Sequence, residues 1–175
     1  MGWVRTAREL LHQGPFVALY RDSVRRPDGT AGTYEHVVVE DGVRVVALDG
    51  DDHVVLVEDD FYLQGQRVLH LPGGGCAGQD PRDAARRELE EETGLVAGEL
   101  RLLGVVDPLP ATTSARTYLF VATGLRPGAV HRDATEAGMT VQRWPLDDAV
   151  AAIHSGRITE AGSMVALLLT DRGQA

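Results

Sequence analysis

The chain has 175 residues, a formal net charge of −9 at pH 7, and 17 basic side chains that are all arginine. This length suits one domain with a substantial core. The acidic balance argues against a broad nucleic-acid-binding face, and the absence of any run of 18 apolar residues argues against a membrane-spanning helix. We expect a globular protein with neither nucleic-acid nor membrane partners. The lack of lysine, with abundant alanine, valine and glycine, is typical of a bacterial protein from a GC-rich genome.

Cysteine usage and the N-terminal sequence bear on the compartment. Cys76 is the only cysteine, which excludes an intrachain disulfide and suits a reducing environment. The first residues, MGWVRTARELLHQG, lack an apolar signal core followed by a small-residue cleavage site. We therefore expect a cytoplasmic protein in which Cys76 fills space rather than acting as a nucleophile.

The first forty residues predict an antiparallel β-hairpin extension. Residues 3–12 suit a short helix or an irregular lead-in. Phe16–Val24 has the pattern of a strand, the RPDGT segment at 26–30 that of a turn, and Tyr34–Glu40 that of the partner strand. We expect residues 1–40 to precede the main domain as a separate unit.

The main domain, residues 41–175, begins with strands. Val43–Leu48 and His53–Glu58 are apolar and β-branched on either side of an acidic turn. Phe61–Arg67 has the composition of a loop or edge segment, and Val68–Leu71 that of a short strand.

A single helix between groups of strands organises the rest of the chain. After it, hydrophobic patterns predict strands at 99–106, 117–122 and 141–144, loops at 107–115 and 127–138, and helices at 146–155 and 158–169. Strands on both sides of a central helix, followed by terminal helices, predict a mixed sheet covered by helices.

The central helix carries clear start and stop signals. Asp80 suits the N-cap, Pro81 the first helical position and Gly94 the residue that ends the helix. The buried stripe would consist of alanines and a leucine, namely Ala84, Ala85 and Leu89. Ahead of the helix, residues 72–75 form a proline–glycine loop whose backbone can approach a ligand closely.

Three glutamates of this helix share one face. Glu88, Glu91 and Glu92 stand at i, i+3 and i+4, where like charges repel one another. A solvated acidic face is the alternative for such a run taken alone. The capped helix, its glycine stop and the preceding glycine loop favour a hard divalent cation, which prefers carboxylate oxygens.

The stretch from Gly73 to Leu95, GGGCAGQDPRDAARRELEEETGL, resembles the Nudix box, G-x5-E-x7-R-E-U-x-E-E-x-G-U with U aliphatic. Eight of the nine defined positions match, and these are Gly73, Arg87, Glu88, Leu89, Glu91, Glu92, Gly94 and Leu95. The departure is Gln79, which replaces the first glutamate of the box. Its amide retains hydrogen-bonding capacity but cannot form the ion pair that braces the loop and helix in the family.

The resemblance implies an α/β/α sandwich and hydrolysis of a nucleoside diphosphate linked to another moiety. It places Glu88, Glu91 and Glu92, with a backbone carbonyl near Gly73, around Mg²⁺ or Mn²⁺. Arg87 would orient a box glutamate and fix the helix–loop geometry.

Beyond the box, the chain resembles the ADP-ribose pyrophosphatase branch of the Nudix hydrolases. The hairpin with its PDG turn is similar to the extension through which that branch dimerises, which implies a homodimer. HVVLVEDDFY is similar to a strand and loop of the branch, although Asp59 replaces the usual glutamine. Pro110 and the ending VQRWPLDDAVAAIHSGRITEAGSMVALLL complete the resemblance.

Catalytic and substrate-binding candidates follow from the same resemblance. Glu136, in the loop before the W-x-P-L strand, is the candidate general base; a solvated loop residue is the alternative, and Glu88 or Glu91 would then be the base. Phe61, Arg67 and Pro110 are candidates for binding the nucleotide, although aromatic and arginine side chains at such positions more often serve packing.

We therefore expect metal-dependent hydrolysis of ADP-ribose or a related nucleoside diphosphate sugar to a nucleoside monophosphate and a sugar phosphate. Another nucleotide substrate, such as a nucleoside triphosphate or dinucleotide, keeps the same chemistry. A regulatory module that binds nucleotide without turnover is the alternative of a different class. Gln79 favours that alternative, and the intact segment RELEEETGL weighs against it.

Overall fold

The computed structural model describes residues 2–128 and 138–173. The chain forms two compact units: Met1–Glu40 together with Asp107–Arg116, and Asp41–Val106 together with Thr117–Ala175. Within the described residues, none of the helices has both the length and the apolar character needed to cross a membrane.

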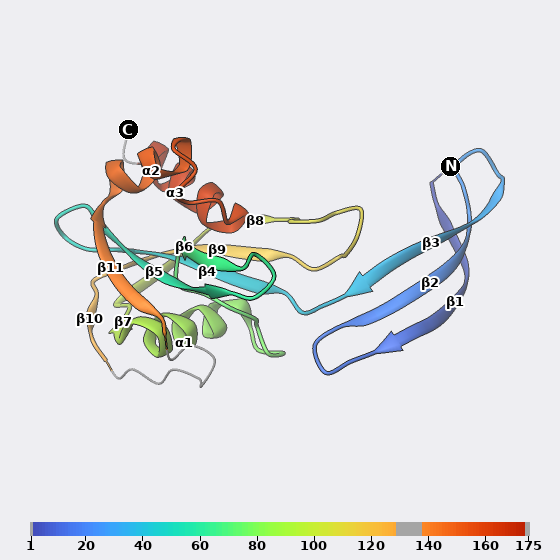
Figure 1. Cartoon of the computed structure of the whole chain (residues 1–175), viewed down its shortest axis with the longest axis horizontal. Coiled ribbons are helices and arrows are strands. Elements are labelled where there is room, and N and C mark those ends of the chain that lie inside the picture. The colour runs from blue at the N-terminus through green and yellow to red at the C-terminus, as the bar shows by residue number, and fades with distance from the viewer. Residues whose placement is uncertain (1, 129–137, 174–175) are drawn as a thin grey trace. The chain divides into compact units, whose positions relative to one another are not determined.

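The N-terminal unit is a three-stranded antiparallel sheet (Figure 1). Its strands are β1 (Val4–Gln13), β2 (Ala18–Arg25) and β3 (Ala31–Val38), with β2 in the centre. The β2–β3 hairpin confirms the sequence prediction, and Gly29 adopts the positive φ of 88° that its turn requires.

The prediction of a helix or an irregular lead-in over residues 3–12 was wrong, because these residues form β1 and pair along β2. Nearly every β1 side chain is exposed, so the strand lacks the alternation that identifies strands from sequence. Pairing with the open edge of β2 decides its conformation instead.

A polar cluster crosses this sheet. Arg8 of β1 donates two hydrogen bonds to the Asp22 carboxylate of β2, with N–O distances of 2.7 and 2.9 Å, and lies over the Tyr20 ring. The bonds from Arg8 lower the pKa of Asp22 to about 2. Residues 107–116 join the same unit, since Val37 N–H donates to the Thr112 carbonyl and the Tyr34 hydroxyl to that of Ala111.

The main unit is built on a six-stranded mixed sheet with the order β11-β5-β4-β9-β8, in which β6 also pairs with β5. Only the β4–β9 pair is parallel. The strands are β4 (Gly42–Leu48), β5 (His53–Phe61), β6 (Gln66–His70), β8 (Glu99–Val106), β9 (Thr117–Thr123) and β11 (Thr140–Pro145). Two short strands, β7 (Leu95–Val96) and β10 (Arg126–Pro127), pair separately.

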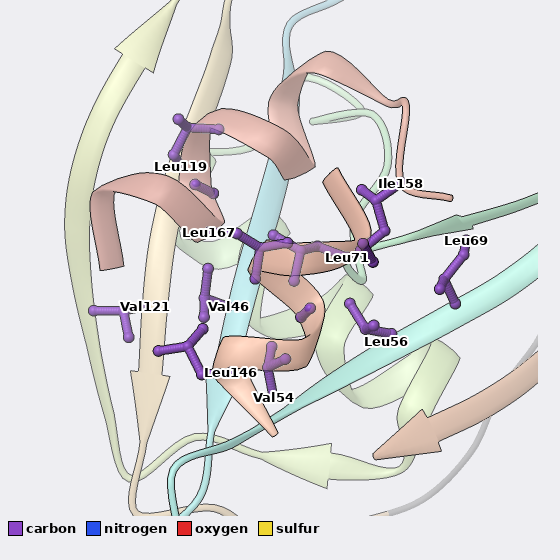
Figure 2. Close-up of a cluster of buried hydrophobic side chains, with 13 residues drawn as sticks. Val46, Val54, Leu56, Leu69, Leu71, Leu119, Val121, Leu146, Ile158 and Leu167 are labelled. Carbon is purple, nitrogen blue, oxygen red and sulfur yellow. The ribbon is translucent and has the colours of Figure 1, made fainter. Parts of the chain in front are cut away.

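Helices cover both faces of this sheet (Figure 1). Helix α1 (Pro81–Thr93) lies on one face, and α2 (Leu146–His154) and α3 (Ala161–Gly173) lie on the other. Successive side chains of β4 point to opposite faces of the sheet. Val43 and Val45 pack in the hydrophobic cluster with α1, and Val46 packs in the cluster with α2 and α3. Figure 2 shows the second cluster, where Leu146 and Leu167 lie among strand side chains.

The predicted α/β/α sandwich is thus confirmed, with small shifts at element ends. Strand β8 has the predicted bounds. The segment Phe61–Arg67, expected to be a loop or edge segment, contains the end of β5, a tight turn and the start of β6 at Gln66. The last helix begins at Ala161 rather than Ile158, although the Ile158 side chain is fully buried in the core.

The core predicts a large cost for truncating Leu56, which is fully buried in β5. Leu56→Ala should lower the free energy of unfolding by about 2–5 kcal/mol, because transfer and cavity terms add. Leu63→Ala, at a side chain that is 88% exposed in the β5–β6 turn, should change it by less than about 0.5 kcal/mol. Urea unfolding of both variants measures this difference; equal costs would contradict the assignment of the core.

Candidate active site

Helix α1 has the predicted ends. The Asp80 side chain accepts a hydrogen bond from Arg82 N–H at 2.8 Å, and Pro81 occupies the first turn. Gly94 ends the helix in the left-handed conformation, with a φ of 71°, and donates its N–H to the Glu90 carbonyl. The local signals of the sequence therefore fix where the helix begins and ends.

Two of the three glutamates are buried. Glu88 is 8% exposed and Glu92 is 3% exposed, whereas Glu91 is partly open to solvent. Glu92 accepts a hydrogen bond from Gly73 N–H at 2.9 Å. A Cβ atom on Gly74 would lie 2.6 Å from a Glu88 carboxylate oxygen, so a larger residue there would have to displace that carboxylate. The loop thus lies directly against the acidic face of α1.

Arg87 connects the helix to this loop. Its Nη1 contacts Glu91 at 2.8 Å and Glu88 at 2.9 Å, and its Nη2 donates to the Gly75 carbonyl at 2.9 Å. Partial burial opposes protonation of the guanidinium, but the hydrogen bond to Glu91 and the charge of Glu88 outweigh it and raise the pKa of Arg87. The side chain is therefore a permanent cation between two carboxylates.

Gln79 occupies the position of the missing box glutamate and contacts the same arginine. Its Oε1 accepts a hydrogen bond from Arg87 Nε at 3.0 Å. The geometric connection between loop and helix is therefore present, but its acceptor is a neutral amide rather than a carboxylate.

The glycine loop is fixed from its other side by strand β4. Val45 N–H donates to the Pro72 carbonyl and Val43 N–H to the Gly74 carbonyl, both at 2.9 Å. Gly73, between them, has a φ of 149°, and a Cβ atom there would lie 2.1 Å from the Val43 carbonyl oxygen. The loop therefore continues the edge of the sheet, and glycine is required where it passes closest to β4.

The donor chemistry of this junction suits a hard divalent cation. The junction gathers three carboxyl groups and one guanidinium: Arg87 contacts Glu88 and Glu91, and the side chains of Glu88 and Glu92 are buried. Carboxylate and backbone carbonyl oxygens are the ligands such cations prefer. In this arrangement Arg87 and Gly73 N–H contact the carboxylates, and the described residues contain no group of three His, Cys, Asp or Glu side chains gathered as around an ion.

The remaining site candidates make contacts of their own or lie outside the described residues. Phe61 packs edge to face on His70, with ring centroids 5.2 Å apart. Arg67 donates to the Glu58 carbonyl at 2.7 Å and to the Gly138 carbonyl at 3.2 Å. Pro110 lines a cavity of about 300 Å³ in the N-terminal unit. Glu136 lies outside the described residues.

Sequence reasoning missed part of the loop's role. It assigned residues 72–75 to approach a ligand, whereas the structure shows that Gly74 makes room for Glu88 and that Gly75 supplies an acceptor for Arg87. A third consecutive glycine was the available signal, since one glycine would have sufficed for a turn.

Comparison with known proteins agrees with this geometry. Residues 39–162 match the NUDIX domain family, and residues 3–37 match the nucleoside diphosphate sugar hydrolase N-terminal domain. The chain belongs to the Nudix hydrolase family. Members of this family generally use divalent metal ions, which accords with the donor set of the junction.

Two curated relatives match nearly the whole chain. An ADP-ribose pyrophosphatase of Mycobacterium tuberculosis is 34% identical over 166 residues, which are 91% of this chain and 79% of the relative. A CMP-5'-(N-acetyl-N-hydroxy-3-aminopropyl)phosphonate hydrolase of Streptomyces rubellomurinus is 26% identical over 170 residues, covering 96% of this chain and 82% of the relative.

A solved structure supports the fold. The crystal structure of an ADP compounds hydrolase superimposes with a TM-score of 0.86 and 22% sequence identity, covering 100% of this chain and 97% of the other. At this identity the likeness establishes the Nudix fold.

The contact between Gln79 and Arg87 predicts that a carboxylate at position 79 is stabilising. Gln79→Glu should raise the free energy of unfolding by up to about 1 kcal/mol at low salt, the usual range for a partly exposed ion pair. The gain should shrink as salt screens the pair. Gln64→Glu, the same change in the exposed β5–β6 turn, is the matched control for urea unfolding. No difference between the two variants would show that the neutral amide already suffices.

Proposed function

We propose that this Nudix hydrolase cleaves the diphosphate linkage of ADP-ribose or a related nucleoside diphosphate sugar, giving a nucleoside monophosphate and a sugar phosphate. The observation that carries the proposal is the pair of buried carboxylates, Glu88 and Glu92, fixed between Arg87 and the glycine loop. The name of the Mycobacterium tuberculosis relative supports ADP-ribose as the substrate.

The reaction adds water across a phosphoanhydride. The water oxygen bonds to one phosphorus, the bridging P–O bond breaks, and the proton of the water passes to a base. When bound, Mg²⁺, or alternatively Mn²⁺, neutralises diphosphate charge and acidifies the attacking water. In this proposal Glu88, Glu91 and Glu92, with the carbonyl of Gly73, hold the cation.

Other residues of this chain orient the groups that react. Arg87 fixes the rotamers of Glu88 and Glu91 through its contacts at 2.9 and 2.8 Å, which limits the reorganisation needed on binding. Glu136 is the proposed general base; Glu88 or Glu91 would take this role if Glu136 does not reach the water.

Nucleotide recognition is proposed for Phe61, Arg67 and Pro110. Phe61 offers an aromatic ring whose orientation is fixed by its edge-to-face contact with His70. Arg67 already bonds two backbone carbonyls, so its proposed contribution is to order the neighbouring backbone as well as to contact substrate.

A cytidine nucleotide is the second candidate substrate. It is favoured by the relative from Streptomyces rubellomurinus, which acts on a CMP-linked phosphonate and matches this chain over 96% of its length. The chemistry at the phosphoanhydride would be the same, with a different base recognised.

The test is nucleoside monophosphate release from ADP-ribose, CMP-linked and other nucleoside diphosphate sugars, dinucleotides and nucleoside triphosphates, with Mg²⁺ and with chelator. We expect turnover with Mg²⁺, highest on ADP-ribose and abolished by chelator. Glu92→Gln and Glu88→Gln should each lower kcat/KM by about 100-fold or more, because even outer partners of metal ligands are worth 10–100-fold.

The matched control is Glu99→Gln, the same chemical change at an exposed position of β8, which should leave turnover unchanged. Turnover on another member of the panel would change the assigned substrate but leave the proposed reaction unchanged. Unchanged hydrolysis in both Glu88→Gln and Glu92→Gln would overturn the proposal.

We further propose that residues 1–40 form a dimerising extension to a Nudix domain of residues 41–175, in a cytoplasmic homodimer. The N-terminal unit exposes large apolar side chains, including Trp3, Leu10 and Phe16, the last being 83% exposed. We propose that the partner subunit covers them, because exposed apolar surface of this kind marks interaction sites.

Light scattering at micromolar concentration should therefore give twice the 18.8 kDa mass of one chain. Leu10→Glu should shift the mass toward the monomer, because it places a charge in the apolar surface. Leu63→Glu introduces the same charge at an exposed leucine of the main unit and should leave the dimer intact. A monomeric mass for the unmodified protein would refute the dimer.

A further inference from the structure

An ion pair lies behind the glycine loop, on the side of the sheet opposite α1. Arg44 of β4 and Glu160, just before α3, approach to 3.0 Å between Nε and Oε2, and both side chains are largely buried. Val43 and Val45 pack toward α1, so the alternation of the strand directs Arg44 toward α3. No part of the proposed reaction uses this pair.

Glu160 is the acceptor for the start of α3. Its carboxylate accepts hydrogen bonds from the backbone N–H of Gly162 at 3.1 Å and of Ser163 at 2.7 Å, and from the Ser163 hydroxyl at 2.7 Å. Burial alone would raise the pKa of Glu160, but the Arg44 charge and these bonds lower it to about 2. The carboxylate is therefore ionised at neutral pH and fixes the direction of the Ser163 hydroxyl.

Ser163 connects Glu160 to Leu71, the residue just before the glycine loop. Its side chain is fully buried, and its Oγ accepts the N–H of Leu71 at 2.9 Å. Because the hydroxyl proton is donated to Glu160, the oxygen lone pairs point to Leu71. The Leu71 carbonyl bonds in turn to His70 Nδ1 at 2.8 Å, so both backbone polar groups of Leu71 have fixed partners.

Arg44 also reaches the loop by a second route. Its Nη1 donates to the Val43 carbonyl at 2.9 Å. That same carbonyl oxygen is the atom that excludes any Cβ on Gly73. Two contacts therefore restrict the position of Gly73, whose N–H bonds to Glu92: the hydrogen bond of Leu71, two residues earlier in the chain, and the close approach of the Val43 carbonyl in β4.

We propose that Arg44, Glu160 and Ser163, here called the loop brace, are positioning residues that set the backbone of residues 71–75 against Glu92 and thereby the affinity of the junction for a divalent cation. This inference rests on the proposed metal-dependent function. The loop brace touches neither substrate nor cation, and it acts through Leu71 and Gly73.

The test measures Mn²⁺ binding to the full chain without substrate, by electron paramagnetic resonance, and amide hydrogen exchange at Gly73. Ser163→Ala removes the acceptor for Leu71 N–H, and Glu160→Gln keeps the side-chain size but removes the charge. Each should weaken Mn²⁺ binding by about 10-fold, the lower end of the effect of outer partners of metal ligands, and should speed exchange at Gly73.

Ser155→Ala is the matched control, because Ser155 is exposed after α2 and its hydroxyl donates to the Ala152 carbonyl of the same helix. It should leave both readouts unchanged. Urea unfolding of every variant separates a positioning role from general stability: Mn²⁺ affinity should fall in Ser163→Ala and Glu160→Gln under conditions where both remain fully folded.

Two different results would contradict the proposed role of the loop brace, and they separate a failure of this role from a failure of the proposed metal site. If Glu92→Gln loses Mn²⁺ affinity while Ser163→Ala and Glu160→Gln keep it, the loop brace is wrong and the proposed site stands. If Glu92→Gln binds Mn²⁺ as the unmodified protein does, the proposed metal site is wrong and the loop brace with it.

Discussion

The site depends on the unpaired edge of one strand. Strand β5 pairs with β4 only at Ala47 and Leu48, after which it continues beside β6. The N–H groups of Val43 and Val45 would then lack partners in the middle of the protein, at a cost of about 1–3 kcal/mol each. The carbonyls of the glycine loop satisfy them, so the loop is a component of the sheet whose position is set by backbone hydrogen bonds.

Placing the loop in the sheet has a consequence for α1. The helix starts five residues after the loop and returns its acidic face to it, where Gly73 N–H and Arg87 compensate the buried carboxylates of Glu92 and Glu88. Burying carboxylates is costly unless they are paired and hydrogen-bonded. A junction that holds more carboxylates than guanidinium groups is less stable than an apolar one, and this excess of negative charge suits a ligand of positive charge.

The parts that local sequence determines were predictable, and the parts that depend on distant pairing were not. Both ends of helix α1 were predicted correctly, because Asp80, Pro81 and Gly94 determine them through contacts with residues close in sequence. Strand β1 was missed because its side chains are exposed and β2 decides its conformation. Glu160, the partner of Arg44, lies 116 positions further along the chain, and no local pattern predicts their contact. The one sequence signal for the loop brace was the position of Glu160 just before a helix. That signal was missed as well, because the predicted helix began at Ile158 and so placed Glu160 inside the helix rather than before it.

The substitution at Gln79 is tolerable because the junction has several independent supports. Arg87 contacts Glu88, Glu91 and the Gly75 carbonyl through nitrogen atoms other than the Nε that bonds to Gln79. On its other side the loop is fixed by two bonds from β4 and by Ser163 through Leu71. Since the amide of Gln79 also preserves the hydrogen bond to Arg87, the loss is confined to one charge interaction at an exposed position, where such interactions are weak. These contacts therefore favour a working hydrolase over a module that has lost turnover.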